Sequence, residues 1–292
     1  MIYTLQSELL TVDIEDLGAQ LASIRTKDGT EYLYQGNPEV WARRAPILFP
    51  IIGRLQNNSY LLNDVSYTIS NHGFARDMVF SVVSHSAHSV TFQLKDTPET
   101  KKVYPFSFVL TVTYSLEENR LTKSHTIENC SNNIMYYELG AHDGFQAPLS
   151  PDESMGDYSI LLPGVTAIQP YGMDEHCMLT PKLPPIPTPD SRIALTPATY
   201  HLDTVVLDRT DPATVMLCDS HQTPRVTVEY QDFPYLGIWT QVTPFDTNYV
   251  CLEPWSTLPD AIFAGRELSE KIGIRTLQPN QKEILTYTVS FS

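Results

Sequence analysis

Basic residues are scarce in this chain of 292 residues, which has 19 lysines and arginines against 34 aspartates and glutamates. The formal net charge is −15 at pH 7 with the histidines neutral. A protein with this excess of negative charge repels phosphate backbones and anionic lipid surfaces. The composition therefore argues against nucleic acid and membrane as partners.

Cysteine is also scarce, and the four copies are far apart, at Cys130, Cys177, Cys218 and Cys251. No C-x-x-C pair occurs, so the sequence predicts neither a disulfide framework nor a cysteine zinc site. His85 and His88 are three residues apart, but no cysteine or third histidine lies near them. We therefore expect reduced, mostly buried cysteines and no bound metal.

A long apolar run is missing as well. The most apolar stretch, residues 45–53, contains two prolines and is much shorter than the span of about 20 residues that crosses a membrane. Residues 1–8 lack the basic and apolar regions of a secretory signal. We expect a soluble protein that resides in the cytoplasm.

Helical patterns are nearly absent. Proline outnumbers glycine by 22 to 13, and each proline removes a backbone donor and breaks helix interiors. Only residues 265–272 have a weak pattern for a short helix. Hydrophobic residues make up 42% of the chain, which is enough for a packed core and excludes a disordered acidic tail.

The dominant period is two residues. Between 106 and 116 every second residue is apolar, and the residues between are mainly serine and threonine. This alternation indicates a strand with one buried face, followed by a turn at 117–119 and a returning strand at 121–128. Similar patterns occur at residues 60–70, 79–95, 226–230 and 285–291. The sequence thus predicts an all-β fold, a large antiparallel β-sandwich or barrel.

One proline-rich stretch is the only candidate for a domain boundary. Residues 181–197 contain six prolines, so they cannot form a central strand. They form either a linker between two domains or a long surface loop. We favour the loop, because the strand patterns are the same on both sides, and we expect a single domain over residues 1–292.

Four segments carry side chains suited to chemistry: residues 71–77, 138–145, 202–207 and 249–255. They place His72 in a bend, His142 at the end of a strand, and Asp203 and Glu253 in apolar strands. Histidine exchanges protons near neutral pH, and a buried carboxylate is costly unless it is paired or functional. For each there is a simpler interpretation, namely a solvated histidine in a loop or an edge-strand carboxylate in water. No motif for nucleotide, calcium or acyl-enzyme chemistry occurs.

Seven short segments, taken in order, resemble the aldose 1-epimerase (galactose mutarotase-like) family, in particular its LacX-like branch. They are APILFPIIGR (45–54), NHGFAR (71–76), LGAHDGF (139–145), HLDT (201–204), LGIW (236–239), CLEPW (251–255) and KIGI (271–274). Each segment alone is unspecific, but their order spans nearly the whole chain. The resemblance implies a galactose mutarotase-like β-sandwich of one domain.

The resemblance also implies an activity, the interconversion of the α and β anomers of a free hexose. Ring opening removes a proton from the C1 hydroxyl and adds one to the ring oxygen, so a base and an acid must flank the anomeric carbon. By position, Glu253 resembles the base and His142 the acid. His72, Asp203, Arg54 and Arg76 resemble residues that bind the sugar. The implied chemistry needs no cofactor and no metal.

Three alternatives remain open on the sequence. Arginines 43, 44, 54 and 76 would suit a hexose 6-phosphate as in a related branch, although we favour solvated positions for Arg43 and Arg44.

Asp143 replaces a proline common after the acid histidine. It would either raise the pKa of His142 or face solvent, and it makes a non-catalytic sugar-binding protein conceivable. A glycosidase using Glu253 and Asp203 is a weaker third interpretation, and the sequence fits a monomer or a homodimer.

Overall fold

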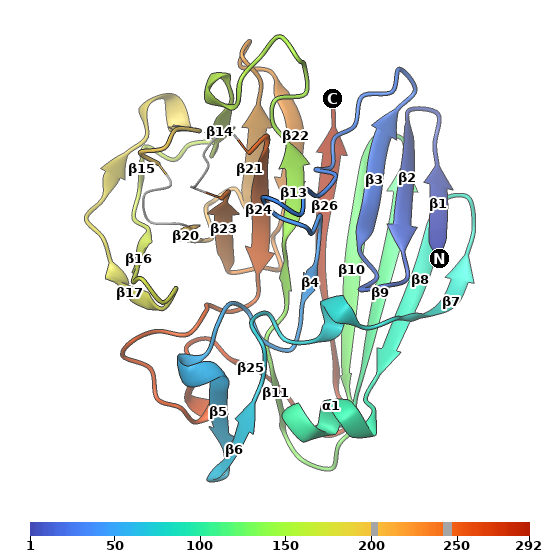
Figure 1. Ribbon diagram of the computed structural model, residues 1–292, viewed down its shortest axis with the longest axis vertical. Coiled ribbons are helices and arrows are strands. Elements are labelled where there is room, and N and C mark those ends of the chain that lie inside the picture. The colour runs from blue at the N-terminus through green and yellow to red at the C-terminus, as the bar shows by residue number, and fades with distance from the viewer. Residues whose placement is uncertain (200–203, 242–246) are drawn as a thin grey trace.

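The strands form two large antiparallel sheets, as a computed structural model of residues 1–199, 204–241 and 247–292 shows (Figure 1). The nine-stranded sheet has the order β19 (Arg192–Ala194), β14 (Ser159–Leu161), β21 (Thr214–Cys218), β22 (Pro224–Glu229), β26 (Lys282–Phe291), β10 (Arg120–Asn129), β9 (Phe108–Glu117), β8 (Ser89–Lys95) and β7 (Ser81–His85). The predicted antiparallel β-sandwich class is thereby confirmed.

The eight-stranded sheet carries the residues of interest for function. Its order is β17 (Leu179–Lys182), β16 (Tyr171–Met173), β20 (Thr204–Asp208), β23 (Tyr235–Trp239), β24 (Tyr249–Trp255), β12 (Gly140–Ala141) and β4 (Ile47–Leu48), and β13 (Asp143–Gln146) also pairs with β24. Strand β24 has neighbours on both sides, so all seven of its residues are buried.

Four smaller sheets accompany the two large ones in the described residues. They are β1 (Ile2–Gln6), β2 (Leu10–Glu15) and β3 (Leu21–Thr26); β5 (Ser59–Leu62) with β6 (Val65–Thr68); β11 (Met135–Tyr137) with β25 (Arg275–Leu277); and β15 (Ala167–Ile168) with β18 (Ile186–Pro187). In Figure 1 the three N-terminal strands lie in front of β8, β9 and β10. The hydroxyl of Tyr114, on β9, donates to the carbonyl of Ala19 and fixes this packing.

Helices are few and short in the described residues. The α-helix is α1 (Pro98–Val103), and the 3-10 turns are η1 (Gln56–Asn58), η2 (Ala75–Asp77), η3 (Met155–Asp157), η4 (Pro189–Ser191) and η5 (Leu268–Glu270). Helix α1 was not predicted, although Thr97 caps it, with Thr100 closing a capping box and Pro98 at its first position. The helix predicted over residues 265–272 is reduced to η5. No helix in these residues is both long and apolar enough to cross a membrane.

The proline-rich stretch is more ordered than a plain loop. It contributes to β17, β18, η4 and β19. Strands β17 and β19 each lie at the end of a large sheet, where proline is tolerated because one side of the strand needs no hydrogen bonds. The prediction that this stretch contains no central strand holds, but the prediction of a loop throughout was wrong.

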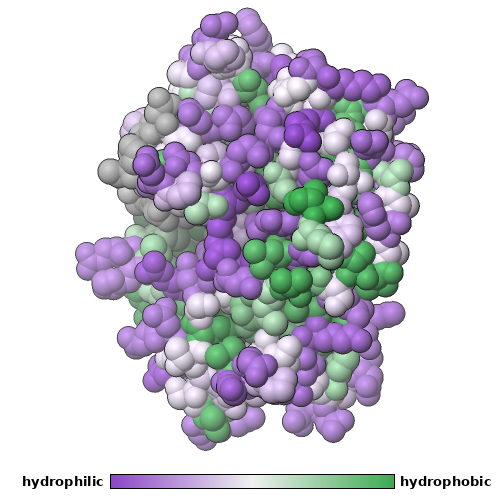
Figure 2. Space-filling view, turned by 45° about the vertical axis from the view of Figure 1, so that its right-hand side comes forward, coloured by the Kyte–Doolittle hydropathy of each residue, from purple (hydrophilic) through white to green (hydrophobic). Residues whose placement is uncertain are grey.

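The core follows the predicted alternation. Along β9 the inward residues are Phe108, Leu110, Val112, Tyr114 and Leu116, all of them buried. On the outside, hydrophilic residues cover most of the face in Figure 2, and hydrophobic side chains gather near its middle and right. Six acidic side chains in the described residues are nevertheless buried: Asp16, Glu138, Asp143, Asp219, Glu253 and Asp260.

One buried ion pair joins the two large sheets. Lys123 occupies an inward position of β10, and its Nζ donates to Oδ1 of Asp143 on β13 at 2.8 Å. The hydroxyl of Tyr287, on β26, donates to the other carboxylate oxygen at 2.6 Å. The ammonium group also lies 5.4 Å from the ring centre of Tyr114 and 5.0 Å from that of Tyr287. Burial lowers the pKa of Lys123, whereas the charge of Asp143 raises it.

We predict that Lys123→Met destabilises the protein by about 3 to 5 kcal/mol, because it leaves the Asp143 carboxylate buried without its cation. Urea unfolding measures this change. Arg25→Met is the matched control, since Arg25 pairs with Asp13 at 2.9 Å on the surface and its loss should cost less than about 1 kcal/mol. Equal effects of the two substitutions would contradict a structural role for the buried pair.

Candidate active site

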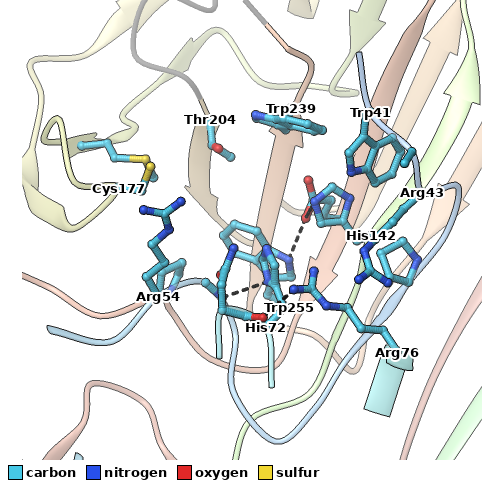
Figure 3. A pocket seen from close by; sticks show the side chains of 17 residues that line it. Trp41, Arg43, Arg54, His72, Arg76, His142, Cys177, Thr204, Trp239 and Trp255 are labelled. Atoms are coloured by element: carbon cyan, nitrogen blue, oxygen red, sulfur yellow. Dashed lines mark hydrogen bonds and ion pairs between the residues drawn. The ribbon is translucent and has the colours of Figure 1, made fainter. Parts of the chain in front are cut away.

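A pocket of about 460 Å³ lies over the eight-stranded sheet (Figure 3). Its walls combine aromatic rings with charged and polar groups. The principal lining residues are Trp41, Trp239, Trp255, Arg43, Arg54, Arg76, His72, His142, Thr204, Cys177 and Glu253. The described residues that were predicted as a site, namely His142, Glu253, His72, Arg54 and Arg76, all line this one pocket. Asp203 lies outside the described residues, next to Thr204.

His142, which lies between β12 and β13, meets Glu253 on the neighbouring strand β24. Asp143 pairs with Leu252 across β13 and β24, which puts His142 beside Glu253 on the pocket face. Nε2 of His142 lies 3.5 Å from Oε2 of Glu253, and the side chains are 9% and 1% exposed. The indole of Trp255 donates to the same carboxylate oxygen at 3.2 Å. The alternative of an edge-strand glutamate with its head in water is thus wrong, because β24 is a central strand.

Aromatic rings enclose His142. Trp41 stacks on it with ring centres 5.0 Å apart, and Trp239 and His72 meet it edge to face at 5.4 Å and 5.5 Å. Burial lowers the pKa of His142 to about 3, and the positive charges of Arg76 and Arg43 act in the same direction. The imidazole is therefore neutral near pH 7.

Asp143 points away from the pocket, and both expectations for it were wrong. Successive side chains of a strand point to opposite faces, so the residue after His142 faces the interior. There Asp143 is held by Lys123 and Tyr287, as described above. It neither faces solvent nor raises the pKa of His142, because its charge is neutralised within the core.

His72 is held by reciprocal hydrogen bonds with the segment after β4. Its backbone N–H donates to the carbonyl of Gly53 at 2.8 Å, and the N–H of Gly53 donates to Nδ1 of His72 at 3.1 Å. An Nδ1 that accepts leaves Nε2 to carry the proton of the neutral ring. Burial lowers the pKa of His72, as do His142 and the nearby arginines. His72 thus offers a neutral N–H donor.

The next residue explains why this bend needs glycine. Gly73 has φ of 71°, and a Cβ at this position would lie 2.2 Å from the carbonyl oxygen of Phe49. Any larger residue would push the bend away from β4 and displace His72. A second glycine serves the pocket floor, because a Cβ on Gly237 would lie 2.6 Å from the ring of Trp255.

Three of the four candidate arginines line the pocket. Arg43 pairs with Asp77 at 2.7 Å, and Arg76 donates to the carbonyl of Asn71 at 2.6 Å. Burial lowers the pKa of Arg76 to about 10, helped by the charge of Arg43. Arg54 is exposed and has no carboxylate partner among the described residues. The expectation of a purely solvated Arg43 was wrong, whereas Arg44 lies off the pocket and donates to the carbonyl of Gln35.

Sequence reasoning missed Trp41 in the aromatic part of the wall. Trp41 belongs to a segment between β3 and β4 with no strand pattern, about 100 residues before His142 in the chain. Trp239 was noticed only as part of a matching segment. Tryptophan faces are the surfaces on which the apolar faces of sugar rings stack, so both rings suit a carbohydrate pocket. Nothing in the local sequence around Trp41 indicated its position.

A second buried network holds the pocket rim. Nζ of Lys271 lies 3.4 Å from both Oε1 of Glu138 and Oδ1 of Asp260. The other oxygen of Glu138 accepts the N–H of Ile52 at 2.6 Å, and that of Asp260 accepts the N–H of Gln56 at 3.0 Å. These two amides bracket the segment that carries Gly53 and Arg54. The network therefore fixes the segment to which His72 is bonded.

Comparison with known proteins agrees with this fold. The family model for aldose 1-epimerase matches residues 1–275. Protein LacX (chromosomal) of Lactococcus lactis subsp. lactis is 32% identical over 99% of both chains. The galactose mutarotase related enzyme from Lactobacillus acidophilus has a TM-score of 0.95 and 34% identity, covering 100% of this chain and 97% of the other. A galactose mutarotase-like protein from Lactobacillus casei gives 0.92 and 30%, with full coverage of both.

The chain belongs to the aldose 1-epimerase family. The predicted class of enzyme, an aldose 1-epimerase-like isomerase, is thereby confirmed.

We predict that Lys271→Met loosens the pocket rim. Without the ammonium group, Glu138 and Asp260 repel each other and hold the amides of Ile52 and Gln56 less firmly. Native-state hydrogen exchange at these two amides should accelerate by about tenfold or more. The control is the amide of Gln6, which donates to the carbonyl of Ala87 far from the pocket. Equal acceleration at all three amides would contradict a local role for the network.

Proposed function

We propose that the protein is an aldose 1-epimerase that interconverts the α and β anomers of a hexose by general acid/base ring opening and reclosure. The observation that carries this proposal is the contact between His142 and Glu253, 3.5 Å apart on the pocket floor. A carboxylate and an imidazole at this separation can each contact one of the two oxygens that are attached to the same carbon. The aromatic walls and the neutral donor of His72 suit a sugar ring.

The proposed reaction moves one proton from O1 to O5. The Glu253 carboxylate takes the proton of the C1 hydroxyl, the C1–O5 bond breaks, and O5 gains a proton while C1 becomes an aldehyde. Rotation about C1–C2 and closure with the roles reversed give the other anomer. No net proton enters or leaves the protein.

The proton that reaches O5 is proposed to pass through His142. Because burial keeps the pKa of His142 at about 3 in the sugar-free pocket, the ring begins the reaction neutral. The proton taken by Glu253 can then protonate the adjacent Nε2, and the imidazolium so formed is a strong acid toward O5. Acid–base catalysis of this kind contributes about 10² to 10⁴-fold to the rate.

The remaining site residues are proposed to bind the sugar. His72 would donate from Nε2 to an oxygen near C1, and Asp203 would accept from sugar hydroxyls. Trp41 and Trp239 would cover the ring, excluding water and strengthening the polar contacts. Arg54 and Arg76 would contact oxygens at the other end of the sugar. No cofactor or metal takes part in this mechanism.

A non-catalytic sugar-binding protein is the alternative to this proposal. One motive for it was Asp143 after the acid histidine, and Asp143 faces the core instead of the pocket. The contact between His142 and Glu253 supports the catalytic proposal over the binding one.

A hexose 6-phosphate is a second candidate substrate, supported by one specific observation. Arg43, Arg54 and Arg76 converge on the pocket of a chain whose net charge is −15. A neutral sugar does not require three cations, whereas a phosphate group is bound well by arginine. Of the three, Arg54 is not engaged by a carboxylate in the described residues, and it is the residue we expect to contact a phosphate.

The proposal also covers the location of the protein, its domain organisation and its partners. The protein acts in the cytoplasm as a single domain over residues 1–292, either as a monomer or as a homodimer. Its partner is a small sugar, and neither nucleic acid nor a membrane takes part.

We predict that Glu253→Gln and His142→Gln each reduce the catalysed anomerisation rate at least about 100-fold, because each removes one end of the proton path. Polarimetry or exchange NMR on freshly dissolved α-glucose and α-galactose measures the rate. Glu229→Gln is the control, since Glu229 pairs with Arg120 at the surface. Wild-type protein that leaves the rates of a broad panel of sugars and sugar phosphates unchanged would refute the proposed function.

The choice between free and phosphorylated hexose rests on Arg54. If phosphate is recognised, Arg54→Gln should lower kcat/KM for glucose 6-phosphate about 10 to 100-fold, as expected for a lost charged hydrogen bond. The value for free glucose should change little. Arg44→Gln is the matched control outside the pocket. A loss of equal size for both sugars would instead favour the free hexose as substrate.

A further inference from the structure

The proposed mechanism leaves one reactive group beside the catalytic pair unused. Cys251 lies two residues before Glu253 on β24, so the two side chains point to the same face of the sheet. The thiol is fully buried. The acceptor or donor atoms of His142, Cys251 and Glu253 all lie within 4.8 Å of one another. Among the described residues, this is the one group of three histidine, cysteine or acidic side chains placed close enough to hold a metal ion.

We propose that His142, Cys251 and Glu253 form a binding site for one Zn²⁺ ion and that the bound ion blocks the sugar pocket. This site goes beyond the proposed epimerase activity, whose mechanism uses no metal. Zinc is commonly bound by three protein ligands, with a fourth coordination position left open. Histidine nitrogen, cysteine sulfur and carboxylate oxygen are all zinc ligands. The fourth position here would be filled by water from the pocket.

The distances suit a tetrahedral ion after a small closing movement. Zinc bonds of about 2.0 to 2.3 Å place neighbouring ligand atoms about 3.4 to 3.6 Å apart. Nε2 of His142 and Oε2 of Glu253 already lie 3.5 Å apart. The largest separation in the group is no more than 4.8 Å, so the thiol needs to approach by about 1.3 Å at most.

The charges of the group also suit a divalent cation. One thiolate and one carboxylate neutralise the two positive charges, so the occupied site carries no net charge in a buried position. The ion itself drives the thiol to lose its proton, since a coordinating thiol is deprotonated. Magnesium and calcium prefer six or more oxygen ligands, so a soft nitrogen and sulfur donor set selects against them.

Glycine at position 144 keeps side-chain atoms out of the narrow gap between the thiol and Trp41. Gly144 pairs with Cys251 across the sheet, and a Cβ on Gly144 would lie 3.5 Å from the thiol sulfur and 2.8 Å from the ring of Trp41. Trp41 is itself part of the pocket wall. An ion entering from the pocket would first meet His142 and Glu253 and then the sulfur next to them.

The test uses Co²⁺ as a spectroscopic probe and Zn²⁺ for affinity, both added to sugar-free protein. We expect one Co²⁺ per chain and a near-ultraviolet thiolate-to-cobalt band. Cys251→Ser and Cys251→Ala should abolish the band and weaken Zn²⁺ binding in calorimetry at least about tenfold. The band should persist in Cys177→Ser, which changes the pocket-lining cysteine, and in Cys218→Ser, which changes the other buried one.

Three results would overturn the site: no band at saturating Co²⁺, a band that survives replacement of Cys251, or a band lost with Cys177→Ser. If the Cys251 variants do not fold, His142→Gln answers the same question, because unchanged Zn²⁺ affinity in that variant would equally overturn it. Binding is read without sugar turnover. Failure of the metal site and failure of the epimerase proposal are therefore separate outcomes.

Discussion

The salt bridge between Lys123 and Asp143 is the interaction on which the geometry of the pocket depends. It crosses the interior from β10 to β13 and anchors β13 at the residue that follows His142. Because side chains alternate along a strand, an inward Asp143 requires an outward His142. The same register places Glu253 opposite His142. A slip of one residue would exchange the two faces and bury the imidazole in the core.

The pocket is rich in positive charge, although the chain as a whole is negatively charged. The protein is strongly acidic, yet Arg43, Arg54 and Arg76 line the pocket, and Glu253 is the one carboxylate among its described lining residues. The arginine charges and burial together keep His72 and His142 neutral. Neutral imidazoles can donate and accept hydrogen bonds, and an imidazole of low pKa releases a proton readily once it has gained one. We propose that the positive rim contacts the distal oxygens of a sugar and that His142 and Glu253 on the floor face its anomeric centre.

The sequence predicted the fold class, and it singled out five of the described residues that line the pocket. Two-residue alternation predicted β9 and β10, because each strand has one buried face. His142 and Glu253 stood out because a histidine at a strand end and a carboxylate in an apolar strand are unusual. The orientation of Asp143 was not predictable from neighbouring residues, since its partner Lys123 lies 20 positions away on another sheet. Trp41 was missed for the same reason, as its place is set by tertiary packing on His142.

The most direct test of this account is a crystal structure of the protein with a bound hexose. The account predicts that the sugar lies between Trp41 and Trp239, with O1 within hydrogen-bonding distance of the Glu253 carboxylate and O5 within that of Nε2 of His142. A hexose bound with its anomeric carbon turned away from both groups, or bound outside this pocket, would contradict it.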